Sequence, residues 1–173
     1  MEDITLVNRV AESGIITLNL EEMICKDVIV VFDLKDYLFH GLILKEKDFR
    51  DDLKNLDWTP YLSKIVLIQC STDAIIPMWA YMLVATYLVD KAKDVYHGTA
   101  DEYQSLYLRQ KIDALDLSIY EDKRVVIKGC SDVPVPVNGY VHITQKLKPY
   151  AQSIMYGEPC STVPIAKRPR KLS

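Results

Sequence analysis

The sequence predicts an α/β protein: a single domain with a mixed, mostly parallel sheet flanked by helices. After residue 60, short apolar runs of strand length alternate with longer stretches of helical periodicity, in the order β-α-β-α-β-α-β. The run KIVLIQ at 64–69 is apolar on both faces, as is typical of a central strand in a parallel sheet. Two further β-rich runs before residue 45 predict an N-terminal antiparallel hairpin.

Before residue 60 we expect three strands between two helices. The expected order is a helix at 2–13, strands at 15–20, 28–33 and 37–44, and a helix at 45–56. Both helices place apolar residues at helical spacing, and Gly14 suits the C-cap of the first. The second and third strands are separated by a short polar break, which favours a hairpin, and Gly41 indicates a bulge or a close backbone approach in its second arm.

After residue 60 we expect four strands separated by three helices. The strands are expected at 64–69, 94–97, 124–128 and 153–156, and the helices at 77–90, 101–115 and 138–150. Pro77 suits the first turn of its helix, whose sequence MWAYMLVATYLV is apolar on nearly every side and therefore predicts deep burial. Thr99 or Asp101 can cap the next helix.

Composition narrows the classes of protein and partner. The 173 residues are 49% hydrophobic, enough to bury a core without disulfides, so we expect one domain over 1–166 and a mobile basic tail over 167–173. A net charge of −3 argues against nucleic-acid binding. No apolar run reaches the roughly 18–20 residues that span a bilayer, and the acidic N-terminus does not resemble a secretory signal. These features favour a cytoplasmic protein without a membrane partner, and a homodimer is the generic expectation.

Three of the four cysteines follow a predicted strand and precede a serine. They are Cys70 in KIVLIQCST, Cys130 in RVVIKGCSD and Cys160 in SIMYGEPCST. The carboxyl ends of parallel strands share one edge of an α/β sheet, and that edge is where such folds bind ligands. We therefore expect the three thiols to lie together. Cys25 lacks this pattern, so it is interpreted as incidental to the site.

Five long phrases in the chain are distinctive. They are VNRVAESGIITLNLEE, VFDLKDYLFHGLILKEKDFR, DWTPYLSKIVLIQCSTDAIIPMWAYM, RVVIKGCSDVPVP and SIMYGEPCSTVP. Together they resemble the bacterial family known as domain of unknown function 2480, over about residues 7–168. The resemblance implies a cytoplasmic bacterial protein but no activity. Because members of this family are often encoded near iron–sulfur cluster assembly genes, it also implies assembly proteins as partners.

The leading hypothesis is a metal-binding protein for zinc or iron, including an iron–sulfur cluster, that is accessory to iron–sulfur cluster biogenesis. Cys70, Cys130 and Cys160 would be the ligands, because thiolates are soft, charged donors. Asp73 or His97 would supply the fourth ligand or an acid–base group. The spacing of the cysteines matches no CxxC pair or other short metal-binding signature. Three serine hydroxyls, with nearby amides, are expected to donate hydrogen bonds to sulfur: Ser71, Ser131 and Ser161.

Two alternatives stay open. In a thiol-dependent enzyme, Cys70 would be the nucleophile, favoured by the helix that follows it. The base would come from one of four side chains: His97, His40, His142 or Asp73. Ser71 and Thr72, also before that helix, could cradle an anion, although no phosphate-loop or GxGxxG pattern is present. In a non-catalytic interaction domain, aromatic side chains would contact a partner, and the candidates are Tyr37, Trp58, Tyr61 and Trp79.

Overall fold

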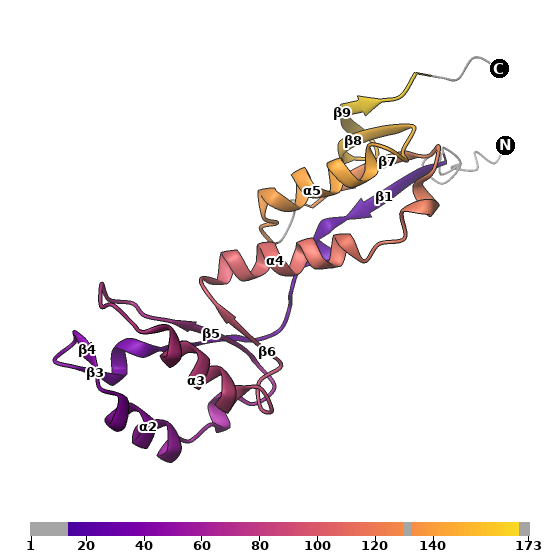
Figure 1. The fold of residues 1–173 in the computed structure, drawn as a ribbon. Coiled ribbons are helices and arrows are strands. Elements are labelled where there is room, and N and C mark those ends of the chain that lie inside the picture. Colours follow the sequence, from indigo (N-terminus) through magenta and orange to yellow (C-terminus); the bar gives the residue numbers. More distant parts are fainter. Residues whose placement is uncertain (1–13, 130–132, 170–173) are drawn as a thin grey trace, which may run out of the picture. The chain divides into compact units, whose positions relative to one another are not determined.

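The chain forms two compact units, each with its own sheet and hydrophobic core. In a computed structural model we describe residues 14–129 and 133–169 (Figure 1). Unit 1 comprises Met1–Cys25 and Gln104–Ser173, and unit 2 comprises Lys26–Tyr103. The helix expected at 2–13 lies outside the described residues. The organisation as one domain over 1–166 stays a prediction.

Unit 2 contains a three-stranded parallel sheet in the order β2-β5-β6. Its strands are β2 (Ile29–Asp33), β5 (Ile65–Gln69) and β6 (Asp94–His97), in the predicted places. The central strand β5 is buried over its first four residues, as its apolar sequence predicts. Two helices belong to this unit, α2 (Glu46–Asn55) and α3 (Met78–Leu88), and α3 is buried along one face only.

The N-terminal hairpin is shorter than expected, and its arms are different. β3 (Leu38–Phe39) pairs antiparallel with β4 (Ile43–Leu44), so the second β-rich run folds back on itself. His40 and Gly41 make the reversal with positive φ angles of 50° and 70°. The run at 28–33 joins β5 in parallel instead of forming the other arm, because the 3₁₀ turn η2 (Leu34–Tyr37) separates it from β3.

Unit 1 contains a four-stranded sheet in the order β1-β7-β8-β9. β1 (Ile15–Asn19), β7 (Arg124–Lys128) and β8 (Ser153–Glu158) are parallel to one another. β9 (Ser161–Lys167) returns antiparallel to β8 and was not expected from the sequence. The proline within β9 argues against a strand interior, and the sheet accommodates it on an edge strand beside a register shift.

Helices α4 (Ala100–Asp113) and α5 (Val137–Leu147) supply buried residues to the unit 1 core, among them Leu108 and Ile143. Three 3₁₀ turns complete the described elements: η1 (Leu20–Glu22), η3 (Thr59–Tyr61) and η4 (Leu117–Tyr120). Within the described residues, no helix has both the length and the apolar content needed to cross a bilayer.

The basic tail is not wholly separate from the fold. Lys167 is the last residue of β9, and the Arg168 guanidinium donates hydrogen bonds to the carbonyls of Pro149 and Tyr150, at 2.9 and 3.0 Å. Arg168 also pairs with Asp122. The first two residues of the expected mobile tail are therefore anchored to unit 1, while residues 170–173 lie outside the described part.

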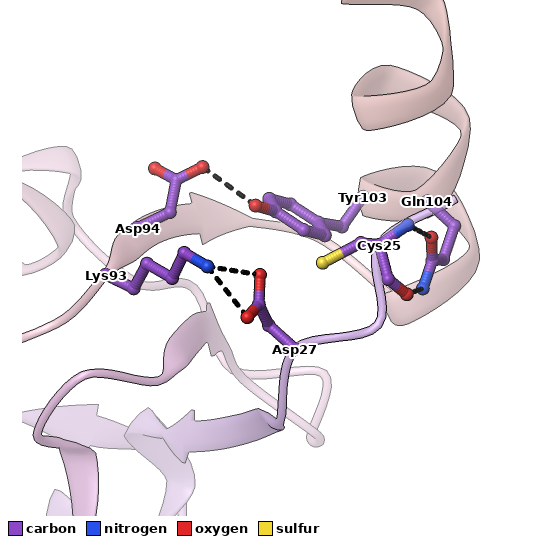
Figure 2. A network of polar contacts seen from close by, with 6 residues as sticks. All are labelled: Cys25, Asp27, Lys93, Asp94, Tyr103 and Gln104. Carbon is purple, nitrogen blue, oxygen red and sulfur yellow. Dashed lines mark hydrogen bonds and ion pairs between the residues drawn. The ribbon is translucent and has the colours of Figure 1, made fainter. Parts of the chain in front are cut away.

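Side chains anchor the chain close to the point where the two units divide in sequence (Figure 2). Within unit 1, Gln104 accepts a hydrogen bond from the Cys25 amide at 3.0 Å and donates one to its carbonyl at 2.9 Å. Within unit 2, Lys93 Nζ lies 2.7 Å from both oxygens of Asp27. Cys25 is buried, so Gln104 satisfies backbone groups that water does not reach easily. This agrees with a structural role for Cys25.

Candidate functional site

Three polar side chains stand where the parallel strands of unit 2 end. Asp33 is the last residue of β2 and His97 the last of β6, while Cys70 directly follows β5. The register places them at one level, because Asp33 pairs with Gln69 and His97 pairs with Ile68. This is the carboxyl edge of the sheet, the usual position of ligand sites in parallel α/β folds.

Asp33 fixes the loop that carries Cys70. Its Oδ1 accepts hydrogen bonds from the amide of Ser71 at 3.1 Å and from the amide of Lys35 at 3.0 Å. Burial works against ionisation of this carboxyl, but the hydrogen bonds from Ser71 and Lys35 hold its pKa below the usual value. Asp33 is therefore an ionised anchor that joins the end of β2 to the residue after Cys70.

The Cys70 thiol is half-buried and has hydroxyl groups near it. Its Sγ lies 3.3 Å from Thr72 Oγ1, within hydrogen-bonding distance for sulfur. Tyr81 of α3 interacts with Cys70 electrostatically: burial raises the pKa of the Tyr81 hydroxyl, and the charge of a Cys70 thiolate raises it further. Tyr81 therefore remains protonated and can donate a hydrogen bond at this edge.

Tyr81 also connects this edge to His97. The two rings are in contact, with centroids 4.7 Å apart and planes inclined by 35°. His97 is exposed at the end of β6, so its imidazole is accessible to solvent. Tyr81 thus contacts His97 directly and interacts electrostatically with Cys70.

The other predicted bases lie elsewhere. His40 occupies the β3–β4 turn and contacts the Phe39 ring, while His142 in unit 1 is bound to Asp113. Asp73 is exposed in the loop between β5 and α3. Because α3 begins only at Met78, the helix dipole proposed to stabilise a Cys70 thiolate is separated from it by that loop. Ser71 and Thr72, both exposed, therefore do not cap the helix either.

The three strand-end cysteines do not share a sheet edge. Cys70 follows β5 in unit 2, whereas Cys160 is exposed in the turn between β8 and β9 of unit 1, followed by Ser161. Cys130 and Ser131 lie outside the described residues, and the strand before them, β7, belongs to the unit 1 sheet. Across 14–129 and 133–169 no three His, Cys, Asp or Glu side chains form a group able to hold a metal. A shared metal stays a prediction.

Two residues at this edge were not identified as site residues from the sequence, namely Asp33 and Tyr81. Asp33 directly follows the apolar run VIVVF, just as Cys70 directly follows KIVLIQ. This pattern would have identified Asp33 as a site residue if residues 28–33 had been assigned to a parallel strand. Tyr81 gave no signal, since it is one of many large side chains in a helix that is apolar on nearly all sides.

Comparison with known proteins gives a family but no activity. No curated protein and no solved structure matches the chain. A family model described as protein of unknown function (DUF2480) matches residues 4–168, nearly the whole chain. This agrees with the resemblance carried by the five sequence phrases, and it establishes that the chain belongs to the DUF2480 family.

Proposed function

We propose that the protein performs thiol chemistry with Cys70 as its nucleophile. The observation that supports this function is the position of Cys70 and His97 at the carboxyl ends of the paired strands β5 and β6, with the Tyr81 ring 4.7 Å from that of His97. A thiol with an imidazole as its base is the pair that cysteine-dependent acyl transfer uses, and a protonated hydroxyl can donate a hydrogen bond to the negative charge that develops on the substrate oxygen. Asp33 acts as a positioning residue, because it holds the backbone of Ser71 beside the thiol.

The proposed step is acyl transfer to sulfur. His97 takes the Sγ proton, Sγ forms a bond to the carbonyl carbon of an acyl substrate, and the bond to the leaving group breaks. The leaving group departs with the electron pair and receives the proton from His97. Thr72 supplies a hydroxyl 3.3 Å from the reacting sulfur, and the protonated Tyr81 hydroxyl is a further donor at this edge. The order of bond making resembles that of other Cys–His sites, which recur on unrelated folds.

The test is the alkylation rate of each cysteine, measured with limiting iodoacetamide and peptide mass spectrometry. Cys160 is an internal control, since it is exposed whereas Cys70 is half-buried. We expect Cys70 to react faster than Cys160 at neutral pH despite its lower exposure. The His97→Gln variant should slow Cys70 by about tenfold and leave Cys160 unchanged. Faster reaction at Cys160, or no effect of His97→Gln, would contradict the proposal.

Metal binding is the competing function, and the same samples test it. In this case zinc or iron would be held by Cys70, Cys130 and Cys160 with Asp73 or His97, and the protein would assist iron–sulfur cluster assembly in the cytoplasm. Elemental analysis of protein purified without oxygen would then find near-stoichiometric metal that Cys70→Ser removes and Cys25→Ser retains. Thiols protected from alkylation until a chelator is added would favour this function over thiol catalysis.

A further inference from the structure

A cavity of about 360 Å³ lies between α4 and α5 in unit 1, whereas the sheet edge that carries Cys70 belongs to unit 2. Four polar side chains that can donate hydrogen bonds line it: Ser105, Arg109, Asn138 and Gln145. His142 and two apolar side chains, Leu106 and Val141, complete the lining. The volume falls at the lower end of the range typical of small-molecule sites, roughly 300–1,000 Å³.

Basic side chains outnumber acidic ones around Asp113, beside this cavity. Asp113 Oδ1 lies 2.8 Å from His142 Nε2 and 3.0 Å from Lys146 Nζ. Hydrogen bonds from Lys146 and His142 hold the pKa of Asp113 below its usual value, so the carboxylate is ionised. One negative charge therefore faces Lys146 and Arg109, with an imidazole as a third basic group. The ion pairs around Asp113 therefore leave one cationic side chain in excess.

Arg109 is only loosely paired with that carboxylate. Its Nε lies 3.9 Å from Asp113 Oδ2, too far for a hydrogen bond, and 67% of its side chain is exposed. Asp113 already accepts close contacts from His142 and Lys146. The planar guanidinium can therefore present two parallel N–H donors to another anion that enters the cavity.

Asp113 also orients the imidazole of His142. An ionised carboxylate only accepts hydrogen bonds, so the Nε2 that contacts it carries the proton. His142 then has its second nitrogen, Nδ1, available as an acceptor when the ring is neutral and as a donor when the ring is protonated.

We propose that this cavity binds the phosphate or carboxylate group of a small anionic molecule. Arg109 holds the anion by a paired set of hydrogen bonds, and Asn138, Gln145 and Ser105 supply further donors from both helices. Leu106 and Val141 cover the less polar part of the same ligand. This inference is independent of the thiol chemistry proposed at Cys70, because the two sites belong to different units.

The test is a titration of the full ¹⁵N-labelled chain with inorganic phosphate and, separately, with acetate, at constant ionic strength. The side-chain amide signals of Asn138 and Gln145 and the Nε–H signal of Arg109 report directly on the cavity. We expect saturable shifts of these signals with one of the two probes, which also identifies the preferred group. Shifts that are linear, or spread evenly over surface residues, would overturn the proposal.

Matched variants separate this cavity from general charge effects. Arg109→Gln should weaken binding of the probe about tenfold, whereas Lys111→Gln, which removes the same charge elsewhere on α4, should change it less than about twofold. Gln145→Glu introduces a negative charge into the lining at nearly constant size and should abolish binding. If Arg109→Gln and Lys111→Gln bind the probe with the same affinity as each other, the site is refuted. This holds even where binding to the wild type is saturable.

Discussion

At the residue scale, Asp33 shows how one carboxylate connects a strand to a reactive loop. It ends β2, caps the 3₁₀ turn η2 through the Lys35 amide, and accepts a hydrogen bond from Ser71, which is distant in sequence. One ionised side chain thereby joins the end of β2 to the backbone after Cys70. The contribution of Asp33 to the stability of the fold depends on its charge, because an ionised acceptor forms stronger hydrogen bonds.

We expect Asp33 to make stability depend on acid pH. Its folded-state pKa is lower than the ordinary value of 3.8, so its contribution is fully present above that pH and is lost as pH falls through the folded-state value. Asp33→Asn should therefore be less stable than the wild type at pH 7, and this difference should shrink on acidification. Urea unfolding at a series of pH values measures it.

Asp73→Asn is the matched control, since Asp73 is an exposed carboxylate in the same loop. We expect its unfolding curves to follow those of the wild type at every pH. Asp33→Ala should cost about 1 kcal/mol at neutral pH, the usual cost of losing a capping side chain. A pH profile of Asp33→Asn parallel to that of the wild type would show that the carboxylate charge does not contribute.

At the scale of elements, a group of aromatic residues in unit 2 forms part of its core. The Phe32 ring stacks on Tyr37 and on Trp58, with centroids 5.3 and 5.9 Å apart and nearly parallel planes. Tyr61 contacts the same ring at 5.7 Å, and Trp79 lies 6.1 Å from Phe49. Four side chains that the sequence offered as partner contacts are thus half-buried against Phe32 and Phe49, which fits core packing.

Helix α5 approaches α4 closely in unit 1 because Gly139 has no side chain. A Cβ at this position would lie 2.2 Å from Leu108 Cδ2, and Leu108 is fully buried. We expect Gly139→Ala to destabilise the protein by about 1–2 kcal/mol, because overpacking outweighs the gain in helix propensity. Urea unfolding of the full chain measures the change.

A double-mutant cycle tests the stated cause. In a Leu108→Ala background the added methyl group has room, so Gly139→Ala should become neutral or stabilising there. The coupling between the two substitutions should be at least about 0.5 kcal/mol and favourable. Additive effects would show that the cost of Gly139→Ala arises from something other than Leu108.

At the scale of the whole molecule, the two hydrophobic cores draw on separate parts of the chain. Every buried residue of the unit 2 core lies between Phe32 and Leu88, whereas the unit 1 core combines residues from both ends of the chain. The segment 26–103 is also continuous and contains the whole β2-β5-β6 sheet. Its length exceeds that of the smallest domains that fold alone, about 55–65 residues.

We therefore expect an isolated fragment of residues 26–103 to fold. It should give a dispersed NMR spectrum and a cooperative urea transition, because its core and its sheet are complete. Phe32→Ala in the fragment is the control and should cost about 3–5 kcal/mol, enough to unfold it. A folded fragment would replace the expected single domain over 1–166 by two, and an unfolded one would support that expectation.

The sequence by itself determined the class of the fold and the position of most elements. The strands at 94–97 and 124–128 have the bounds that the sequence predicts, because apolar periodicity is a local property of the chain. Cys70 and His97 were also identified from their places at strand ends. The missed strand β9 carries a proline, which local patterns interpret as a breaker and only an edge position accommodates.

The tertiary structure alone decided which strands share a sheet. Strand pairing depends on contacts between residues far apart in sequence, so the run at 28–33 could be assigned to a hairpin although it joins β5 in parallel. That single pairing brings Asp33 to the edge that holds Cys70 and His97. β5 and β7 belong to different sheets, so the strand ends that precede Cys70 and Cys130 do not share one sheet edge as the cysteine pattern had predicted.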